Sequence, residues 1–147
     1  MTDLDSFAAL VQRDQGLAVV STLRADHTIQ SSVVNVGVLA HPLTRARVIG
    51  FTTRGSSVKL ANLRVRPRAT VVLRAGWEWA AAEGPVELAG PYDLLPGLSP
   101  EGLRQLLRDV FIAAGGTHDD WPTYDRVMAE EERAVVMVTP QRVYSNA

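Results

Sequence analysis

The order of the β-branched segments is the feature that most restricts the fold of this chain. Short runs rich in Val, Ile and Thr follow one another, and most are separated only by turn residues such as Gly, Pro, Asp and His. Strands joined by such short turns pair as antiparallel hairpins, which excludes a regular βαβαβ sheet. A closed or partly closed barrel also removes exposed strand edges. We predict six strands, over residues 17–24, 28–41, 47–53, 68–79, 80–90 and 134–146.

Helices are predicted around these strands, within a single domain that covers residues 1–147. A chain of this length favours one domain, and it can bury about 68–70% of its unfolded surface. Capping residues or prolines mark the helix starts, and glycine or proline marks most of the ends. These signals place helices within residues 3–16, 56–66, 98–116 and 119–133. We expect a mainly β protein with peripheral helices.

Composition argues against several classes of function. The net charge of −1 is unlike that of a general nucleic-acid binder, for which a basic domain is expected. The chain has no cysteine, so it has no disulfide, thiolate nucleophile or cysteine-bound metal. His27, His41 and His118 lie far apart and form no metal-binding pair, so no metal site is expected. The acidic N-terminal segment and the lack of an apolar run near ~18 residues predict a cytoplasmic protein with no membrane partner.

The segment TTRGSSVKLANLRVRPRATVVL, which starts at Thr52, holds five of the fifteen Lys and Arg residues of the chain. If it contains a helix, Lys59, Asn62 and Arg66 share one stripe of that helix. The first helical turn presents free N–H groups and the positive end of the dipole, which favour an anion. No nucleotide P-loop motif is present, and nucleic acid is not an expected partner at this net charge. A solvated helix and a seat for a phosphorylated cofactor both remain open. The packed face is expected from Val58, Leu60, Ala61, Leu63 and Val65.

Four segments together resemble one protein family. They are S-x-K-x-x-N-L-R-x-x-P-R from Ser57, GWEWAAAEG at 76–84, HDDWPTYDRVMAEEER at 118–133 and TPQRVYSN at 139–146. In order and spacing they resemble the pyridoxamine-phosphate-oxidase-like split barrels, and in particular the small branch that depends on the deazaflavin coenzyme F420. The resemblance implies a six-stranded antiparallel split β-barrel of the FMN-binding type. It also implies a homodimer with the cofactor groove at the subunit interface.

The resemblance further implies where the cofactor lies. Its phosphate would be held by the segment between the third strand and the next helix, and its ring would lie along the second strand. Many relatives place Arg where this chain has Ser57, and Arg54 could supply that charge from the loop. The implied cofactor-binding residues are Gln30, Ser32, Val33, Val34, Asn35, Thr52, Arg54, Ser57, Lys59, Asn62, Trp77 and Trp79.

Other aromatic and charged residues have simpler interpretations. Trp77 and Trp79 are two residues apart and are expected to face the same side of a strand. Trp121 and Tyr124 are predicted to pack within a helix, and the run Glu130–Arg133 is read as a solvated helix end. No general acid or base can be identified. Hydride transfer from a deazaflavin depends mainly on positioning and on exclusion of water, so this absence does not contradict the resemblance.

The resemblance therefore implies an oxidoreductase that transfers a hydride between reduced coenzyme F420 and an unsaturated organic small molecule. An FMN-dependent oxidoreductase of the same fold is the first alternative. A flavin- or deazaflavin-binding protein without catalytic activity is the second.

Overall fold

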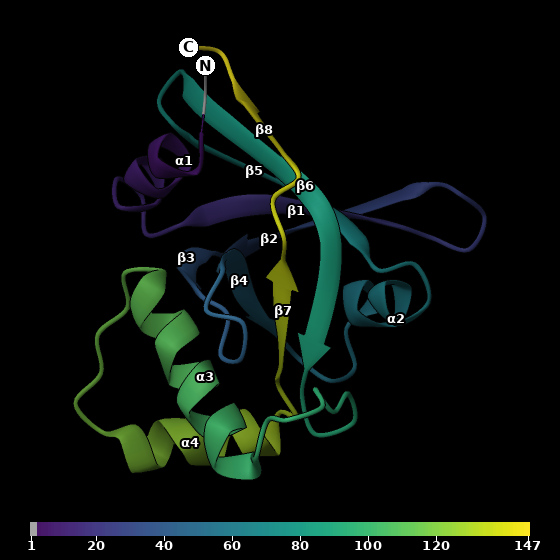
Figure 1. Cartoon of the computed structure of the whole chain (residues 1–147), viewed down its shortest axis with the longest axis vertical. Coiled ribbons are helices and arrows are strands. Elements are labelled where there is room, and N and C mark those ends of the chain that lie inside the picture. Colours follow the sequence, from purple (N-terminus) through teal and green to yellow (C-terminus); the bar gives the residue numbers. More distant parts are fainter. Residues whose placement is uncertain (1–2) are drawn as a thin grey trace.

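The computed structural model describes residues 3–147, and the strands of this part form one antiparallel sheet (Figure 1). The strand order is β2-β1-β5-β6-β7-β4-β3, with β8 paired to β6. The two ends of the sheet approach each other, since β2 also contacts β4. The strands are β1 (Leu17–Leu23), β2 (Ile29–Asn35), β3 (Gly37–Ala40), β4 (Arg47–Thr53), β5 (Arg68–Ala75), β6 (Glu78–Ala89), β7 (Ala134–Val138) and β8 (Arg142–Ser145). The helices are α1 (Leu4–Val11), α2 (Val58–Val65), α3 (Pro100–Ala113) and α4 (Trp121–Glu130).

Strand β6 belongs to both halves of the sheet. Its first part pairs with β5 and β8, and its last residues pair with β7. Gly84 lies where the partner changes, and a Cβ atom there would come within 1.8 Å of the carbonyl oxygen of Thr139. Only glycine permits this close approach of two main chains. A strand shared in this way joins two half-sheets into a split barrel.

The described residues form eight strands rather than the six expected, because two predicted strands are interrupted. At Val36 the main-chain N–H donates to the carbonyl oxygen of Gly16 at 2.8 Å, and the chain changes neighbour from β1 to β4. Near Pro140, which has no N–H to donate, the chain leaves β4 and continues beside β6 alone. Apolar β-branched residues occur on both sides of each interruption, so the sequence pattern did not reveal them. The mainly antiparallel barrel itself is confirmed.

The hairpin between β5 and β6 turns earlier than the sequence analysis placed it. Gly76 and Trp77 form the turn, where Gly76 has a φ of +61°. Trp77 is 93% exposed at this turn, whereas Trp79 lies in β6 and is partly buried. The expectation that the two rings share one side of a strand is therefore wrong.

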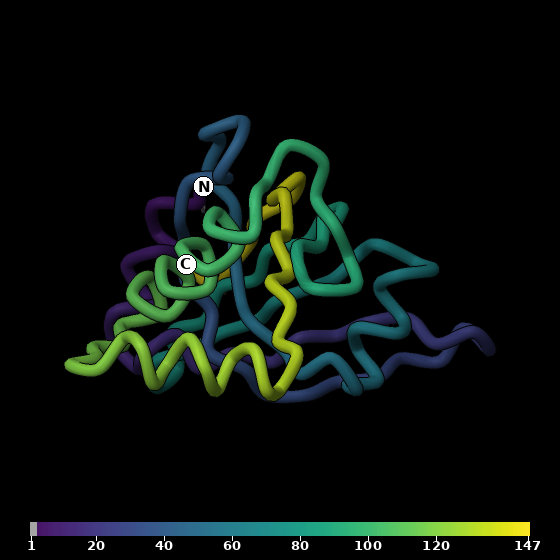
Figure 2. Tube along the Cα trace, turned by 90° about the horizontal axis from the view of Figure 1, so that it is seen from below, coloured from purple at the N-terminus to yellow at the C-terminus, as the bar shows by residue number. Residues whose placement is uncertain are grey.

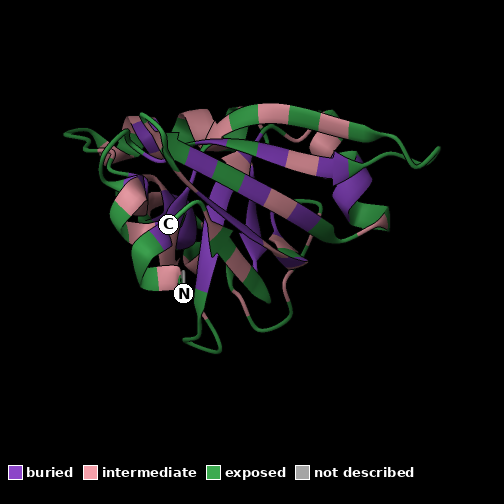
Figure 3. Cartoon of the chain, turned by 90° about the horizontal axis from the view of Figure 1, so that it is seen from above, coloured by how far each residue is buried: buried purple, intermediate pink, exposed green. Residues whose placement is uncertain are grey.

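The core lies on the inner face of the sheet. Along β1, Ala18 and Val20 are buried while Leu17 and Val19 are exposed, an alternation that Figure 3 shows along several strands. Helix α1 adds Phe7 to this core. Its N-cap is Asp3, whose carboxylate accepts the N–H of Ser6. None of the helices in residues 3–147 is long and apolar enough to cross a lipid bilayer.

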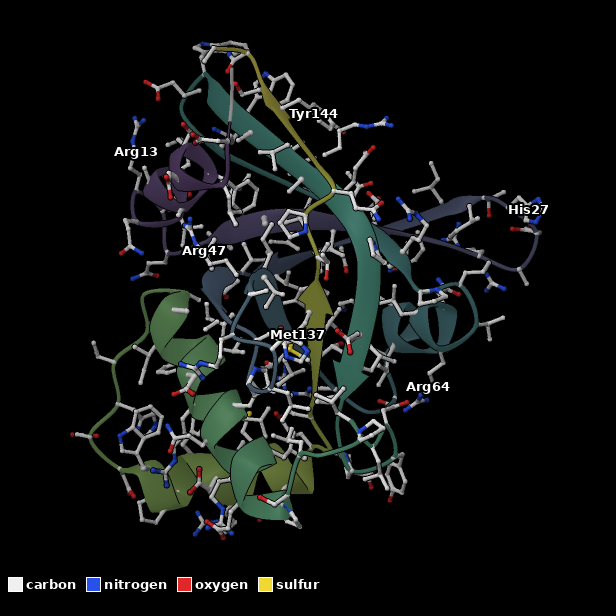
Figure 4. The ribbon with its side chains drawn as sticks, viewed as in Figure 1. Arg13, His27, Arg47, Arg64, Met137 and Tyr144 are labelled. Carbon is white, nitrogen blue, oxygen red and sulfur yellow. The ribbon has the colours of Figure 1, made fainter. Side chains whose placement is uncertain are left out.

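Helices α3 and α4 lie together beside the half-sheet formed by β3, β4 and β7 (Figure 1, Figure 2). Ser99 caps α3 and Asp120 caps α4, as side-chain acceptors of main-chain N–H groups. A second core cluster fills the space beneath the two helices and includes Met137 of β7, labelled in Figure 4. The two helices are thereby fixed against the open end of the barrel, where they form one wall of the candidate site.

Candidate functional site

A cavity of about 430 Å³ lies between β2, the connection from β4 to α2, and helices α3 and α4. Its size is within the range usual for small-molecule sites. One end is polar and cationic, and the opposite wall is apolar and aromatic. The lining residues are Val33, Val34, Asn35, Thr52, Thr53, Arg54, Ser56, Ser57, Lys59, Val110, Phe111, Ala114, Tyr124 and Arg133.

Ser57 is the N-cap of α2, and its hydroxyl is fixed by two neighbours. The oxygen accepts the N–H of Leu60 at 3.2 Å and the hydroxyl of Thr53 at 2.7 Å. Thr53 is buried at the end of β4, so it cannot move away easily. A hydroxyl oxygen has two acceptor positions, and both are occupied here. Ser57 can therefore act toward the cavity only as a donor, which suits an anionic ligand.

Lys59, the only lysine in the chain, lines the cavity together with Ser57. Partial burial, and secondarily the positive charge of Arg133, lower the pKa of Lys59. Within residues 3–147, no carboxylate lies at ion-pair distance from its amine. The site thus holds a cation that lacks a protein counter-ion, close to the first turn of a helix.

Two arginines add to this charge, and both contact the carboxylate of Glu131. Arg54 approaches one oxygen of Glu131 at 2.8 Å, and Nε of Arg133 approaches the other at 3.0 Å. Glu131 is the C-cap of α4 and Arg133 precedes β7, so residues far along the chain complete the cationic end. The run Glu130–Arg133 was expected to be a solvated helix end, but Glu131 and Arg133 are each about three quarters buried in their side chains.

The opposite wall is aromatic. The rings of Phe111 and Tyr124 lie 5.2 Å apart, and Trp121 stands behind them at 5.2 Å from the ring of Tyr124. The hydroxyl of Tyr124 donates to the carbonyl oxygen of Leu107 at 2.9 Å. Burial raises the pKa of Tyr124 to about 12, so the phenol stays protonated at neutral pH. Tyr124 can therefore offer its ring to a ligand, whereas its hydroxyl already donates to the carbonyl oxygen of Leu107. Its predicted packing role is confirmed.

Seven of the twelve residues implied by the resemblance come together around this cavity. They are Val33, Val34, Asn35, Thr52, Arg54, Ser57 and Lys59. The seven come from β2, β4 and the start of α2, three segments that the sequence analysis placed next to the cofactor.

Two others, Gln30 and Asn62, lie behind the site. The amide of Asn62 donates to the hydroxyl of Thr22 at 3.1 Å, and that hydroxyl donates to the side-chain oxygen of Gln30, also at 3.1 Å. Thr22 and Asn62 are buried, so this chain of hydrogen bonds joins α2 to β1 and β2. Both side chains support the walls of the cavity rather than line it.

The remaining three, Ser32, Trp77 and Trp79, also lie outside the cavity. The hydroxyl of Ser32 is buried and has no hydrogen-bond partner within residues 3–147. The two tryptophans line a neighbouring groove of about 460 Å³ on the outer face of the sheet. Val33 lines both spaces, so the groove begins where the cavity ends.

The packed face of α2 also differs from the expectation. Leu60, Asn62 and Leu63 are buried, whereas Val58 and Val65 are 57% and 70% exposed. The helix is rotated so that Asn62 faces β1 and leaves the stripe it was expected to share with Lys59. Lys59 keeps a separate position over the cavity.

Sequence reasoning missed Phe111, Glu131 and Arg133 as site residues. Phe111 and Arg133 line the cavity, and Glu131 contacts both cavity arginines. Their positions depend on how α3 and α4 dock on the barrel, which local patterns do not encode. The one available signal was the segment HDDWPTYDRVMAEEER, which resembled a family motif and ends at Arg133.

Comparison with solved structures reveals the fold. No protein-family model matches the sequence. A conserved hypothetical protein from Mycobacterium tuberculosis is 19% identical, with a TM-score of 0.68 over 99% of this chain and 84% of that one. A solved F420 reductase is 16% identical, with a TM-score of 0.61 over 92% and 94% of the two chains.

A third similar structure is a pyridoxamine 5'-phosphate oxidase-related, FMN-binding protein from Nostoc punctiforme. It is 13% identical, with a TM-score of 0.61 over 97% of this chain and 81% of that one. The three structures match nearly the whole length of this chain and share its fold. The chain therefore has the pyridoxamine-phosphate-oxidase-like split-barrel fold.

Proposed function

We propose that this protein binds a phosphorylated flavin-type cofactor in the cationic cavity and uses reduced coenzyme F420 there to reduce an unsaturated organic molecule. The observation that carries the proposal is the composition of one cavity, in which Lys59, Arg54 and Arg133 lie at one end and an apolar, aromatic wall lies opposite. The likeness in fold to an F420 reductase and to an FMN-binding protein supports this choice of cofactor class.

The donor set fits such a cofactor. The hydroxyl of Ser57, the ammonium of Lys59 and the first-turn N–H groups of α2 are all donors, as a phosphate requires. Val34 and Phe111 offer the apolar surfaces that a flat ring system needs. Asn35 also lines the cavity, and its side-chain amide donates to the carbonyl oxygen of Gln15 at 2.9 Å.

In this proposal, the side chains of the cavity hold the cofactor in position and exclude water from it. Reduced F420 held in this cavity would supply hydride chemistry, and the accompanying proton would come from solvent, since no proton donor is identified among the lining residues described here. Lys59 and Ser57 fix the anionic end of the cofactor, and the wall formed by Phe111 and Tyr124 excludes water from one face of the cavity. Positioning of this kind can supply much of the rate enhancement. Tyr124 is not the proton donor, because its hydroxyl is bonded to a main-chain carbonyl.

We extend the proposal to a homodimer in which a second copy covers the outer face beside the cavity. Val33, Val19 and Val72 lie side by side on β2, β1 and β5, and they are 65%, 43% and 36% exposed. Trp77 stands at the edge of the same groove. A row of apolar residues continuous with a half-open cavity is suited to a two-fold interface that completes the site.

Titration of the purified protein with F420 and with FMN tests the proposal. Trp121 contacts the ring of Tyr124, so cofactor binding should quench its fluorescence. We expect colourless protein from a host that lacks F420, micromolar binding of added F420, and oxidation of reduced F420 when an acceptor is supplied. Retention of stoichiometric FMN would favour the FMN-dependent alternative. Binding without oxidation of reduced F420 by any acceptor tried would favour a non-catalytic binding protein.

A further inference from the structure

The carboxylate of Glu131 lies between two arginines at the cationic end of the cavity. One oxygen is 2.8 Å from Arg54 and the other is 3.0 Å from Arg133. The side chains of Glu131 and Arg133 are each 24% exposed, whereas that of Arg54 is 63% exposed. Both arginines line the cavity, but each guanidinium already has an anionic partner.

The main chain holds Glu131 at this position. The N–H of Gly55 donates to the carbonyl oxygen of Glu131 at 3.2 Å, which joins the loop after β4 to the end of α4. A Cβ atom at Gly55 would lie 2.9 Å from both the Cβ and the carbonyl oxygen of Glu132, so the two segments are in close contact. The loop that carries Arg54 and the turn that carries Glu131 therefore behave as one unit.

The cations of the cavity differ in whether they already have an anionic partner in the protein. Lys59 has no counter-ion within the described residues, and the neighbouring charge of Arg133 contributes to lowering its pKa. Arg54 and Arg133 must instead release Glu131 before they can bind a phosphate fully. Each guanidinium has several N–H donors, so a phosphate oxygen can replace a carboxylate oxygen one for one.

We propose that Glu131 is an internal counter-anion that competes with the phosphate group of the ligand for Arg54 and Arg133, and so sets the affinity of the cavity for anions. The inference rests on the proposed function, since it concerns the same cavity. Glu131 prevents mutual repulsion of three cations in the empty site. It also weakens the binding of every phosphorylated ligand, and it has no effect on the unphosphorylated ring.

The test compares Glu131→Gln with Glu130→Gln, which removes the neighbouring charge. Glu130 is 65% exposed, pairs with Arg126 at 3.7 Å and does not line the cavity. The probes are F420, FMN, riboflavin and inorganic phosphate, measured by calorimetry and by tryptophan fluorescence. We expect Glu131→Gln to bind F420, FMN and inorganic phosphate about three- to tenfold more tightly, the size of a partly exposed ion pair. Riboflavin binding and all binding by Glu130→Gln should equal those of the parent.

A second substitution tests the counter-anion role further, and the phosphate probe separates that role from the proposed binding of F420 or FMN. Adding Arg133→Gln to Glu131→Gln should cancel most of the gain, because the released partner is then absent. Equal or weaker phosphate binding by Glu131→Gln, with an unchanged melting temperature, would overturn the counter-anion role. Failure of F420 and FMN to bind the parent protein would overturn the proposed function, and tighter binding of inorganic phosphate to Glu131→Gln would still support the counter-anion role.

Discussion

At the scale of single residues, the positive charges of the basic segment that starts at Thr52 have two roles. Some line the cavity, and the others bond to acceptors within the protein. Arg54 and Lys59 line the cavity. The other three are committed to protein acceptors: Arg64 (labelled in Figure 4) to Asp93, Arg66 to the carbonyl oxygen of Leu23, and Arg68 to Gln141. The clustering of charge was visible in the sequence, but the choice of partners was not, because each partner lies at least 29 residues away.

Substitution Lys59→Ala tests the cationic end directly. The ammonium would contribute a charge-assisted hydrogen bond worth roughly 1.5–3 kcal/mol, so cofactor affinity should fall on the order of tenfold to a hundredfold. Stability should change little, since Lys59 has no ion-pair partner among the described residues and its loss relieves repulsion with Arg133. Fluorescence titration measures the affinity and thermal unfolding measures the stability.

Arg66→Ala is the matched control for Lys59→Ala. Arg66 lies on the same helix segment, but its side chain bonds to the carbonyl oxygen of Leu23 and does not reach the cavity. Its removal should leave cofactor affinity within about twofold of the parent, within the spread of surface changes. If both variants bind the cofactor as the parent does, the positive end of the cavity is only a solvated surface.

At the scale of elements, the sequence predicted the type and order of nearly every segment but not their exact partners. Helices α2 and α3, capped by Ser57 and Ser99, lie within the ranges predicted for them, because capping chemistry is local. The interruption at Val36 and the rotation of α2 depend on tertiary neighbours. Seven implied site residues came together because their segments were placed correctly, whereas the orientation of Asn62 was decided by the buried hydroxyl of Thr22.

Contact between β3 and α3 is expected to control the aromatic wall of the site. A Cβ atom at Gly37 would lie 2.5 Å from the main-chain carbon of Ala113, which cannot yield without moving α3. We expect Gly37→Ala to lower the free energy of unfolding by about 1–3 kcal/mol, as overpacking does. Cofactor affinity should fall with it, since α3 carries Phe111 into the cavity. Chemical denaturation and cofactor titration measure the two effects.

Gly50→Ala provides the comparison for Gly37→Ala. The nearest atom to a Cβ at Gly50 is Cδ2 of Leu39 at 2.8 Å, the end of a flexible side chain that can rotate away. This variant should lose less stability than Gly37→Ala and should keep its affinity for the cofactor. Equal losses in the two variants would show that α3 tolerates displacement and does not set the shape of the cavity.

At the scale of the whole molecule, the cavity lies where three parts of the fold meet. The barrel supplies β2 and β4, the basic segment supplies α2, and the helical pair supplies the aromatic wall and the turn at Glu131. The barrel was predictable from its hairpins. Docking of the helical pair onto it was not, since a contact such as that between Arg54 and Glu131 joins residues 77 positions apart. The sequence therefore predicted the half of the site built on the barrel and missed the half built on α3 and α4.

The proposal that a second copy covers the outer face beside the cavity depends on the oligomeric state of the protein. We expect light scattering after size exclusion to give a mass near twice 16.0 kDa. Val19 lies between Val33 and Val72 in the exposed row, so Val19→Glu would place a charge at the centre of the interface. A buried unpaired carboxylate is costly, so this variant should be monomeric. It should also bind the cofactor more weakly, because the second wall of the groove is lost.

Val65→Glu controls for the charge itself. Val65 is 70% exposed on α2 and lines neither the cavity nor the groove, so this variant should remain dimeric with the affinity of the parent. Val19 is itself 43% exposed in a single chain, so a glutamate there reaches solvent in the monomer and the fold should survive, as near-parental circular dichroism would show. A monomeric parent protein that binds the cofactor as tightly as proposed would mean that one chain forms the entire site. A dimeric Val19→Glu would place the interface on another face of the barrel.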